Sequence, residues 1–325
     1  MILKALGSFI MAAGLWQLLP TDLSALEYRA GVGGEEASKI SYVEFENEQA
    51  SLPRAGMRSM VNYPVKTDPG SFGVVTTARS VLIEDADSGM IMVAKHPYAI
   101  RSIGSVTKLM TALVFLETNP DLNASVTLTD ADLIEGGRIY LRFEDPIVLH
   151  DLLQAGLIGS DNSAMESLVR LSGLSNEAFV IRMNSKAKEL GMSNSVFVDP
   201  SGIDAGNTST AYDLVALLRA AEQEPEIVEA MQTAKITVRQ ASGYSVDIEN
   251  TNELLTSFVN EDPFSVRAGK TGYLPQAGYV LATAVAKNDH KIYVVVMGSD
   301  SKDTRVLESK GLISWAFKTF SWPTN

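Results

Sequence analysis

The spacing of apolar residues along this chain is first typical of strands, then of helices, and then of strands again. This order limits the possible fold more than any other feature. The first organised segment is a predicted β-hairpin, with strands at 80–83 and 90–93 around the turn Asp87-Ser88-Gly89. From Ser105 onward, apolar residues recur every three or four positions, which predicts a helix that ends at Asn119-Pro120. Further helices are predicted at about 150–157, 161–172, 175–189 and 209–222. Strand patterns return at 235–248, 267–273, 279–286 and 291–297, and a last helix is predicted over about 303–320.

This order of elements predicts an α+β fold. Strands from the two ends of the organised sequence can pair into one antiparallel sheet, because short polar turns such as Asn288-Asp289 join the later strands. The helical region between them, at about 120–230, is then expected as an inserted subdomain beside the sheet. Helices are expected to flank the sheet.

The N-terminal sequence is typical of an exported protein. Lys4 precedes an apolar run over 5–19 that is shorter than the roughly 20 residues needed to span a bilayer. We therefore expect residues 1–25 to be a signal peptide or an uncleaved membrane anchor. Residues 26–76 lack sustained periodicity and are expected to be an irregular extension, before one domain over 77–321. The predicted location is beyond the cytoplasmic membrane, in the periplasm or facing the cell wall.

Composition excludes several classes of function. The net charge of −12 disfavours a nucleic-acid partner, because a polyanion would be repelled. The chain has no cysteine, and its three histidines (His96, His150 and His290) form no metal-ligand pattern. We therefore expect neither a metal nor a cofactor.

Ser105-Val106-Thr107-Lys108 places a hydroxyl and an amine on one face of the predicted helix. A lysine that loses its proton can activate a serine as a nucleophile. The same S-x-x-K spacing occurs at Ser185–Lys188 and Ser299–Lys302. Only Ser105 lies where an irregular segment enters a strongly apolar helix, so it is the preferred candidate.

Two further tripeptides contain side chains suited to proton transfer or substrate binding. Ser160-Asp161-Asn162 falls between two predicted helices, where a hydroxyl can pass a proton and an amide can hold a carbonyl. Lys270-Thr271-Gly272 falls on a predicted strand and is followed by Tyr273. The lysine and threonine can bind a carboxylate, while the glycine lets a substrate backbone approach closely.

The three motifs together, in this order, are typical of penicillin-binding proteins and class A β-lactamases. Over about 77–321 the chain resembles the serine D-alanyl-D-alanine carboxypeptidases, which are low-molecular-mass penicillin-binding proteins. The resemblance implies that the α+β fold is of the β-lactamase/DD-peptidase type. Other matching strings are Ala187-Lys188-Glu189-Leu190-Gly191-Met192, Pro200-Ser201-Gly202-Ile203-Asp204 and Ala277-Gly278-Tyr279.

The resemblance implies a role for each motif residue. Ser105 is expected to be the acylated nucleophile and Lys108 its general base. Ser160 is expected to relay a proton to the leaving group, while Asn162 holds Lys108 and the substrate amide.

The resemblance also implies a substrate-binding set: Lys270, Thr271, Gly272, Tyr273 and Arg305. Lys270, Thr271 and Arg305 are expected to bind the terminal carboxylate. The backbone N–H groups of Ser105 and Tyr273 are expected to form an oxyanion hole. Peptidoglycan peptides and β-lactam antibiotics are the expected ligands.

The implied activity is that of a serine-type D-Ala-D-Ala carboxypeptidase acting on peptidoglycan stem peptides. Three other functions compete with it. The first is a D,D-endopeptidase that cleaves cross-links. A β-lactamase is less favoured, because 197–202 contains no E-x-x-L-N pattern and Glu166 falls on a helix. A non-catalytic penicillin sensor is also less favoured, because no second hydrophobic span follows the N-terminal one.

Overall fold

The computed structural model describes residues 63–71 and 73–323. The predicted signal peptide or anchor, 1–25, lies outside the described residues, as do residues 26–62 of the predicted extension. The end of that extension is described. There β1 (Val65–Lys66) pairs with β13 (Phe320–Ser321), and Thr67 donates a hydrogen bond to the carbonyl of Thr319. The folded part therefore includes residues that precede position 77.

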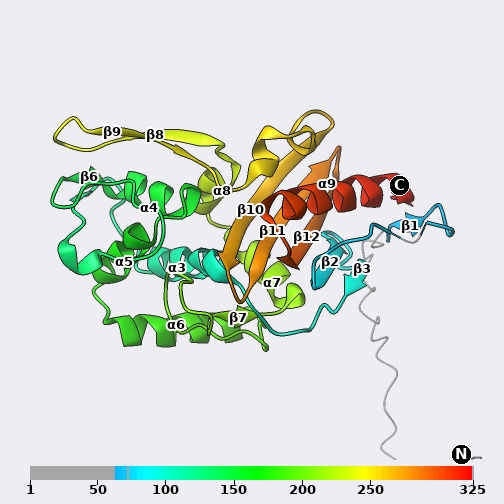
Figure 1. Ribbon diagram of the computed structural model, residues 1–325, viewed down its shortest axis with the longest axis horizontal. Helices are drawn as coiled ribbons and strands as arrows, with labels where there is room; N and C mark the ends of the chain where they lie inside the picture. The colour runs from blue at the N-terminus through cyan, green and yellow to red at the C-terminus, as the bar shows by residue number, and fades with distance from the viewer. Residues whose placement is uncertain (1–62, 72, 324–325) are drawn as a thin grey trace, which may run out of the picture. The chain divides into compact units, whose positions relative to one another are not determined.

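One antiparallel sheet of five strands joins the two ends of the folded chain, in the order β10–β11–β12–β2–β3 (Figure 1). β12 pairs with β2, so a strand near the C-terminus lies against the first long strand of the domain. The strands are β2 (Ser80–Asp85), β3 (Ile91–Lys95), β10 (Phe264–Leu274), β11 (Gly278–Lys287) and β12 (His290–Ser299). This arrangement confirms the predicted α+β fold.

Both faces of the sheet are covered by helices, which explains why its central strands are apolar on both sides. α9 (Lys302–Thr319) packs on one face, where Ile83 lies in the same apolar cluster as Ile313. α7 (Ala211–Ala221) packs on the other face, where Leu82 lies in the cluster that also contains the helical region. Neighbouring residues of β2 thus belong to different layers of the core.

The helical region is built around α3 (Thr107–Leu116), which follows a single turn of 3-10 helix, η2 (Gly104–Val106). Residues 107–115 of α3 are all buried, so this helix is packed around its whole circumference. It packs against four other helices of this region. These are α4 (Leu149–Ile158), α5 (Asn162–Leu171), α6 (Asn176–Glu189) and α7.

Side-chain caps account for where several of these helices begin. Asp161, Ser175 and Thr210 each accept a hydrogen bond from a backbone N–H three residues later. One helix was not predicted, namely α8 (Pro225–Gln232), which begins at a proline. A proline in the first turn leaves the helix intact, because the N–H that it lacks has no partner there.

Short paired strands hold the remaining loops. β4 (Arg101–Ser102) pairs with β7 (Thr208–Ser209), and β5 (Ser125–Val126) pairs with β6 (Ile147–Val148). β8 (Lys235–Arg239) and β9 (Ser245–Glu249) form a hairpin around Ser242-Gly243, within the strand pattern predicted at 235–248. Three further 3-10 turns are η3 (Asp130–Asp132), η4 (Glu253–Thr256) and η5 (Phe258–Asn260).

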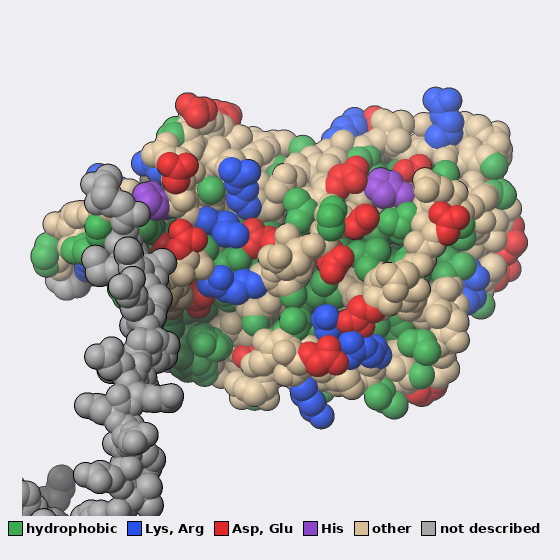
Figure 2. All heavy atoms as spheres, turned by 180° about the vertical axis from the view of Figure 1, so that it is seen from behind, with side chains coloured by type: hydrophobic (Ala, Val, Ile, Leu, Met, Phe, Trp, Pro, Cys, Tyr) green, Lys and Arg blue, Asp and Glu red, His purple; other side chains and the backbone are tan. Residues whose placement is uncertain are grey.

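On the face opposite to that of Figure 1, acidic and basic side chains are intermixed, with apolar side chains between them (Figure 2). Several charged residues of the domain form ion pairs, such as Lys291 with Glu222 at 2.9 Å. None of the helices described here is both long and apolar enough to cross a membrane.

The central position of α3 predicts a large effect of shortening its side chains. Phe115 is fully buried, so Phe115→Ala should lower the free energy of unfolding by about 4 kcal/mol, through lost burial and a cavity. Leu307 is 68% exposed, and Leu307→Ala should change it by less than about 0.5 kcal/mol. Urea unfolding of both variants tests this; equal losses would show that α3 is not the centre of the core.

Candidate active site

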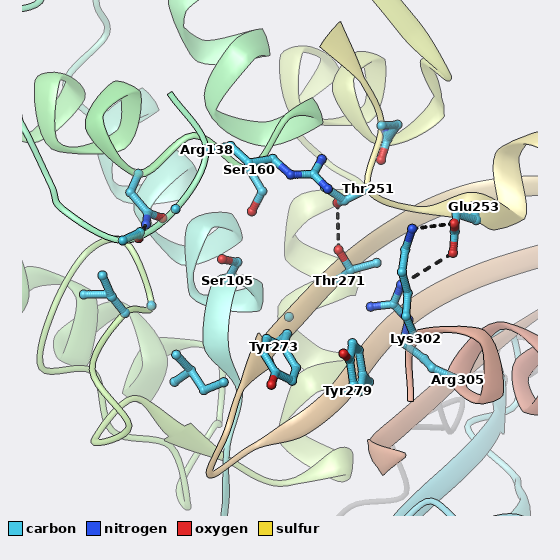
Figure 3. A pocket seen from close by; sticks show the side chains of 18 of the residues that line it. Ser105, Arg138, Ser160, Thr251, Glu253, Thr271, Tyr273, Tyr279, Lys302 and Arg305 are labelled. Atoms are coloured by element: carbon cyan, nitrogen blue, oxygen red, sulfur yellow. Dashed lines mark hydrogen bonds and ion pairs between the residues drawn. The ribbon is translucent and has the colours of Figure 1, made fainter. Parts of the chain in front are cut away.

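The three motifs meet at a cleft of about 520 Å³ between the edge strand β10 and the loops of the helical region. Ser105 and Ser160 face the same space from neighbouring elements, with Thr271 across from them (Figure 3). Lys108 and Lys270 are buried just behind this lining. The predicted residues that line the cleft directly are Ser105, Ser160, Asn162, Thr271, Gly272, Tyr273 and Arg305.

Lys108 is the polar centre of the site. Its ammonium donates to Ser105 Oγ at 3.0 Å and to Asn162 Oδ1 at 2.6 Å, and it also donates to the carbonyl of Ser201. Burial lowers the pKa of Lys108 to about 7, although the nearby carboxylates of Asp199 and Asp161 oppose this shift. A large fraction of Lys108 is therefore neutral near pH 7, and a neutral amine can accept the proton of Ser105 across the same contact.

The three residues of the Ser160-Asp161-Asn162 motif have different roles. Ser160 has a left-handed backbone, with φ of +62°, at the turn between α4 and α5. Asp161 is fully buried and accepts hydrogen bonds from the N–H groups of Ala164 and Tyr140, so its role is to hold this turn. Asn162 accepts from Lys108, and its amide nitrogen donates to Gly136 O at 2.8 Å.

Lys270 joins the strand motif to the helical region. Its ammonium donates to Ser160 Oγ at 2.9 Å. Burial holds the pKa of Lys270 well below its usual range, and the positive charges of Lys108, Arg305 and Arg138 lower it further. A bound carboxylate would relieve this repulsion. Beside it, Thr271 Oγ1 donates to Thr251 Oγ1 at 2.7 Å.

Two glycines allow β10 to lie directly against the turn that carries Ser105. A Cβ on Gly272 would lie 2.1 Å from the carbonyl oxygen of Ile103, which no side chain could tolerate. Gly104 has φ of +54°, and a Cβ there would lie 2.9 Å from the backbone nitrogen of Tyr273. This close approach brings the N–H groups of Ser105 and Tyr273 near each other, as an oxyanion hole requires.

Arg305, on the first turns of α9, is only 3% exposed, although arginines are usually found at the surface. Its pairing is weak for a buried cation, since its nearest carboxylate oxygen, on Glu253, lies 3.9 Å away. Its guanidinium carbon lies 5.9 Å from the ring centre of Tyr279, which in turn packs against Tyr273. Arg305 thus lies at the end of the cleft beyond Thr271 (Figure 3).

Several site residues carry no signal in the sequence. Asp199 Oδ1 accepts from the N–H groups of Ser201 and Gly202, both at 2.7 Å, and Oδ2 accepts from that of Asp204 at 2.9 Å. These bonds hold the loop whose Ser201 carbonyl contacts Lys108. The string Pro200–Asp204 resembles the family pattern, but nothing in it indicates this role. Arg138, Thr251 and Glu253 also line the cleft and belong to no motif. Lys302 lines it as well, although the sequence places it only in the S-x-x-K string Ser299–Lys302.

The hydroxyls of the two remaining S-x-x-K strings, and Glu166, lie elsewhere. Ser185 Oγ donates to the backbone of its own helix, and Ser299 Oγ donates to Glu308 Oε2 at 2.7 Å. Glu166 accepts a hydrogen bond from Asn176 and is not part of the cleft lining. Within residues 63–71 and 73–323, no group of three His, Cys, Asp or Glu side chains could hold a metal ion.

The known proteins to which this chain is similar in sequence are D-alanyl-D-alanine peptidases. A D-alanyl-D-alanine endopeptidase of Haemophilus influenzae is 35% identical over 223 residues, which are 68% of this chain and 74% of that protein. One of Escherichia coli is 32% identical over 240 residues, which are 73% of this chain and 76% of that protein. The D-alanyl-D-alanine carboxypeptidase DacF of Bacillus subtilis is 26% identical over 251 residues, covering 75% and 63% of the two chains.

Solved structures agree. The Streptomyces K15 DD-transpeptidase superposes with a TM-score of 0.70 at 25% identity, over 76% of this chain and all of the other. Penicillin-binding protein D2 of Listeria monocytogenes, in a cefotaxime-bound form, gives 0.66 at 26% identity, over 76% of this chain and all of the other. The sequence profile of peptidase family S11, D-alanyl-D-alanine carboxypeptidase, matches residues 68–301. The chain therefore belongs to this family, and it is a serine DD-peptidase of peptidoglycan.

Proposed function

We propose that this protein is a D,D-endopeptidase that cleaves peptidoglycan cross-links through an acyl-enzyme on Ser105. The observation that carries the acyl-enzyme mechanism is the contact of 3.0 Å between Ser105 Oγ and a fully buried Lys108 whose pKa is about 7, and the choice of an endopeptidase is supported by the relatives compared below. In the described part of the chain, this is the one S-x-x-K pair whose hydroxyl meets its own lysine at a cleft.

Acylation begins when neutral Lys108 takes the proton of Ser105 and the hydroxyl oxygen attacks the carbonyl carbon of a D-alanyl residue. The carbonyl oxygen becomes negative and is held by the N–H groups of Ser105 and Tyr273. Lys108 is now an ammonium, which its bonds to Asn162 and the Ser201 carbonyl stabilise. The lysine therefore needs no rearrangement between its two protonation states.

The bond to the leaving nitrogen breaks when that nitrogen receives a proton. Ser160 is placed to give it, because its hydroxyl lines the cleft and is held by Lys270 at 2.9 Å. The proton taken by Lys108 then returns to the leaving amine by way of Ser160. Water next attacks the ester and Lys108 accepts the proton of the water. Lys108 returns this proton to Ser105 Oγ as the ester bond breaks, which restores the free enzyme.

A site that binds a carboxylate suits the leaving group of a cross-link. The amine of that leaving group is attached to a carbon of D configuration, and the same carbon carries a carboxylate. Lys270, Thr271 and Arg305 lie together beyond Ser105, where that carboxylate would be. Burial and neighbouring cations disfavour the charge of Lys270, and the carboxylate that pairs with Arg305 lies 3.9 Å away, so a bound carboxylate would stabilise the positive charge of both residues.

The leaving group decides between the two activities. Relatives described as endopeptidases are 32% and 35% identical to this chain, whereas the carboxypeptidase DacF is 26% identical. This difference supports an endopeptidase over the carboxypeptidase expected from the sequence. Release of a terminal D-alanine is the second candidate, because the family is described by that reaction and Arg305 can bind a terminal carboxylate.

Two observations disfavour a β-lactamase and a penicillin sensor. Asp199 is the carboxylate in the stretch where a β-lactamase would need its deacylating base. Its oxygens accept hydrogen bonds from the N–H groups of its own loop and are not free to activate water. A complete set of groups for proton transfer also argues for an enzyme rather than a sensor.

The proposed substrate implies the place of action. Cross-linked peptidoglycan lies outside the cytoplasmic membrane, so we propose that residues 1–25 direct export and that the enzyme works in the periplasm or facing the wall. Peptidoglycan peptides and β-lactams are its proposed ligands.

Replacing the nucleophile tests the mechanism. Ser105→Ala should abolish labelling by a fluorescent penicillin and reduce peptide hydrolysis by more than about 10³-fold, with an unchanged thermal unfolding curve. Ser185→Ala, which removes the hydroxyl of another S-x-x-K string, should label normally. Labelling that persists in the Ser105 variant would place the nucleophile elsewhere.

The pKa of Lys108 predicts a pH profile. Only the neutral amine accepts the proton of Ser105, so the penicillin acylation rate should rise with pH and reach half of its plateau near pH 7. Well below that pKa, the rate should fall by about tenfold per pH unit. Stopped-flow acylation measures this. A half-maximum at the pKa of an ordinary lysine would exclude Lys108 as the base.

Incubation with purified muropeptides tests the leaving group. We expect mass spectrometry to show loss of the cross-linked dimer and gain of monomer, faster than loss of D-alanine from a pentapeptide. Release of D-alanine with the dimer intact would favour the second candidate instead.

A further inference from the structure

Beyond Arg305, the cleft ends in an ion pair that the mechanism above does not use. Lys302 Nζ lies 2.7 Å from Glu253 Oε1, and both residues line the cleft. Figure 3 shows, in order of increasing distance from Ser105, Thr271, then Lys302 and Arg305, with Glu253 outermost. The pair therefore lies on the side where the leaving group would extend.

Glu253 is shared unequally between two cations. Its contact with Lys302 is 2.7 Å, but its contact with Arg305 is 3.9 Å, which is too long for a hydrogen bond. Arg305 is 3% exposed, and its Nε has no hydrogen-bond partner among the described residues. A substrate carboxylate can therefore approach Arg305 while Glu253 stays with Lys302.

The position of Lys302 is not explained by helix stability. It is the first residue of α9, where the macrodipole opposes a positive charge. A lysine that opposes the dipole and also lines the cleft is better explained by what the cleft binds.

Around the cleft, positive side chains outnumber carboxylates. Arg138, Lys302 and Arg305 line the cleft, against Glu249 and Glu253, and Lys270 lies just behind. A terminal D-alanine brings a single carboxylate. A leaving strand from a cross-link is itself a peptide, so it brings the carboxylate beside its amine and at least one more at its own end.

We propose that Lys302 binds a second carboxylate of a cross-linked leaving strand, and that Glu253 is the resident counter-ion that this carboxylate displaces. The pair thereby selects leaving groups with more than one negative charge. This inference rests on the proposed endopeptidase function and names the residues that set its preference.

The two halves of the pair then have opposite effects. Lys302→Gln removes the attraction, so kcat/KM for the cross-linked dimer should fall by about fivefold, as expected for a half-exposed charge contact. Glu253→Gln removes the competitor, so the same constant should rise by about twofold to fivefold. For release of D-alanine from a pentapeptide, both changes should be smaller. A purely structural ion pair would make both variants change in the same direction.

Steady-state hydrolysis of purified dimer and pentapeptide by the full chain tests this, at low and high salt. Lys318→Gln, an exposed lysine at the other end of α9, is the matched control and should leave both constants unchanged. High salt should shrink the difference between the Lys302 and Glu253 variants.

The outcomes separate the two proposals. If the wild-type chain leaves the dimer intact, the proposed function is wrong, and the inference fails with it because no second carboxylate enters the cleft. If the wild-type chain cleaves the dimer but both variants shift in the same direction, or shift equally for both substrates, only the inference is overturned.

Discussion

The buried ammonium of Lys108 is the interaction on which the rest of the site depends. A charged group at full burial costs free energy unless it is paired, and here three oxygens surround it. Two of them, from Asn162 and the Ser201 carbonyl, lie on other segments of the chain, so the lysine ties α5 and the 199–207 loop to α3. The same burial that makes these contacts necessary also lowers the pKa of Lys108 to about 7. The burial of Lys108 therefore accounts both for the contacts that hold these segments together and for the ability of the lysine to act as a base.

The sheet contributes the second wall of the site. β10 is an edge strand, so one side of its backbone is free to face the cleft. Gly272, which has no side chain, lets that backbone lie against the turn of Ser105. Lys270 then reaches Ser160, so that two separate lysine–serine pairs face one space. Because the pairs come from different layers of the fold, neither forms without correct packing of the sheet and the helical region.

Sequence patterns predicted the α+β fold, most of the elements and the convergence of the three motifs. They did so because helices, strands and turns are largely determined by residues close together in the sequence. In addition, the S-x-x-K spacing places the serine and the lysine on the same side of a helix. They missed α8, since Pro225 looks like a break rather than a first turn. They also missed Asp199 and Glu253, whose roles depend on which loops lie beside the cleft. That Arg305 is buried could not be inferred from its neighbours along the chain. These are properties of tertiary packing, which local patterns do not encode.

The central claim is that burial lowers the pKa of Lys108 to about 7, so that a large fraction of this lysine is neutral near pH 7 and can act as the base. Nuclear magnetic resonance of the protein with isotope-labelled lysine, assigned with a Lys108→Arg variant, would follow its side-chain signals through a pH titration. The account predicts that the signal lost in the variant titrates near pH 7. A Lys108 that stays protonated to above about pH 10, as an ordinary lysine does, would contradict the account.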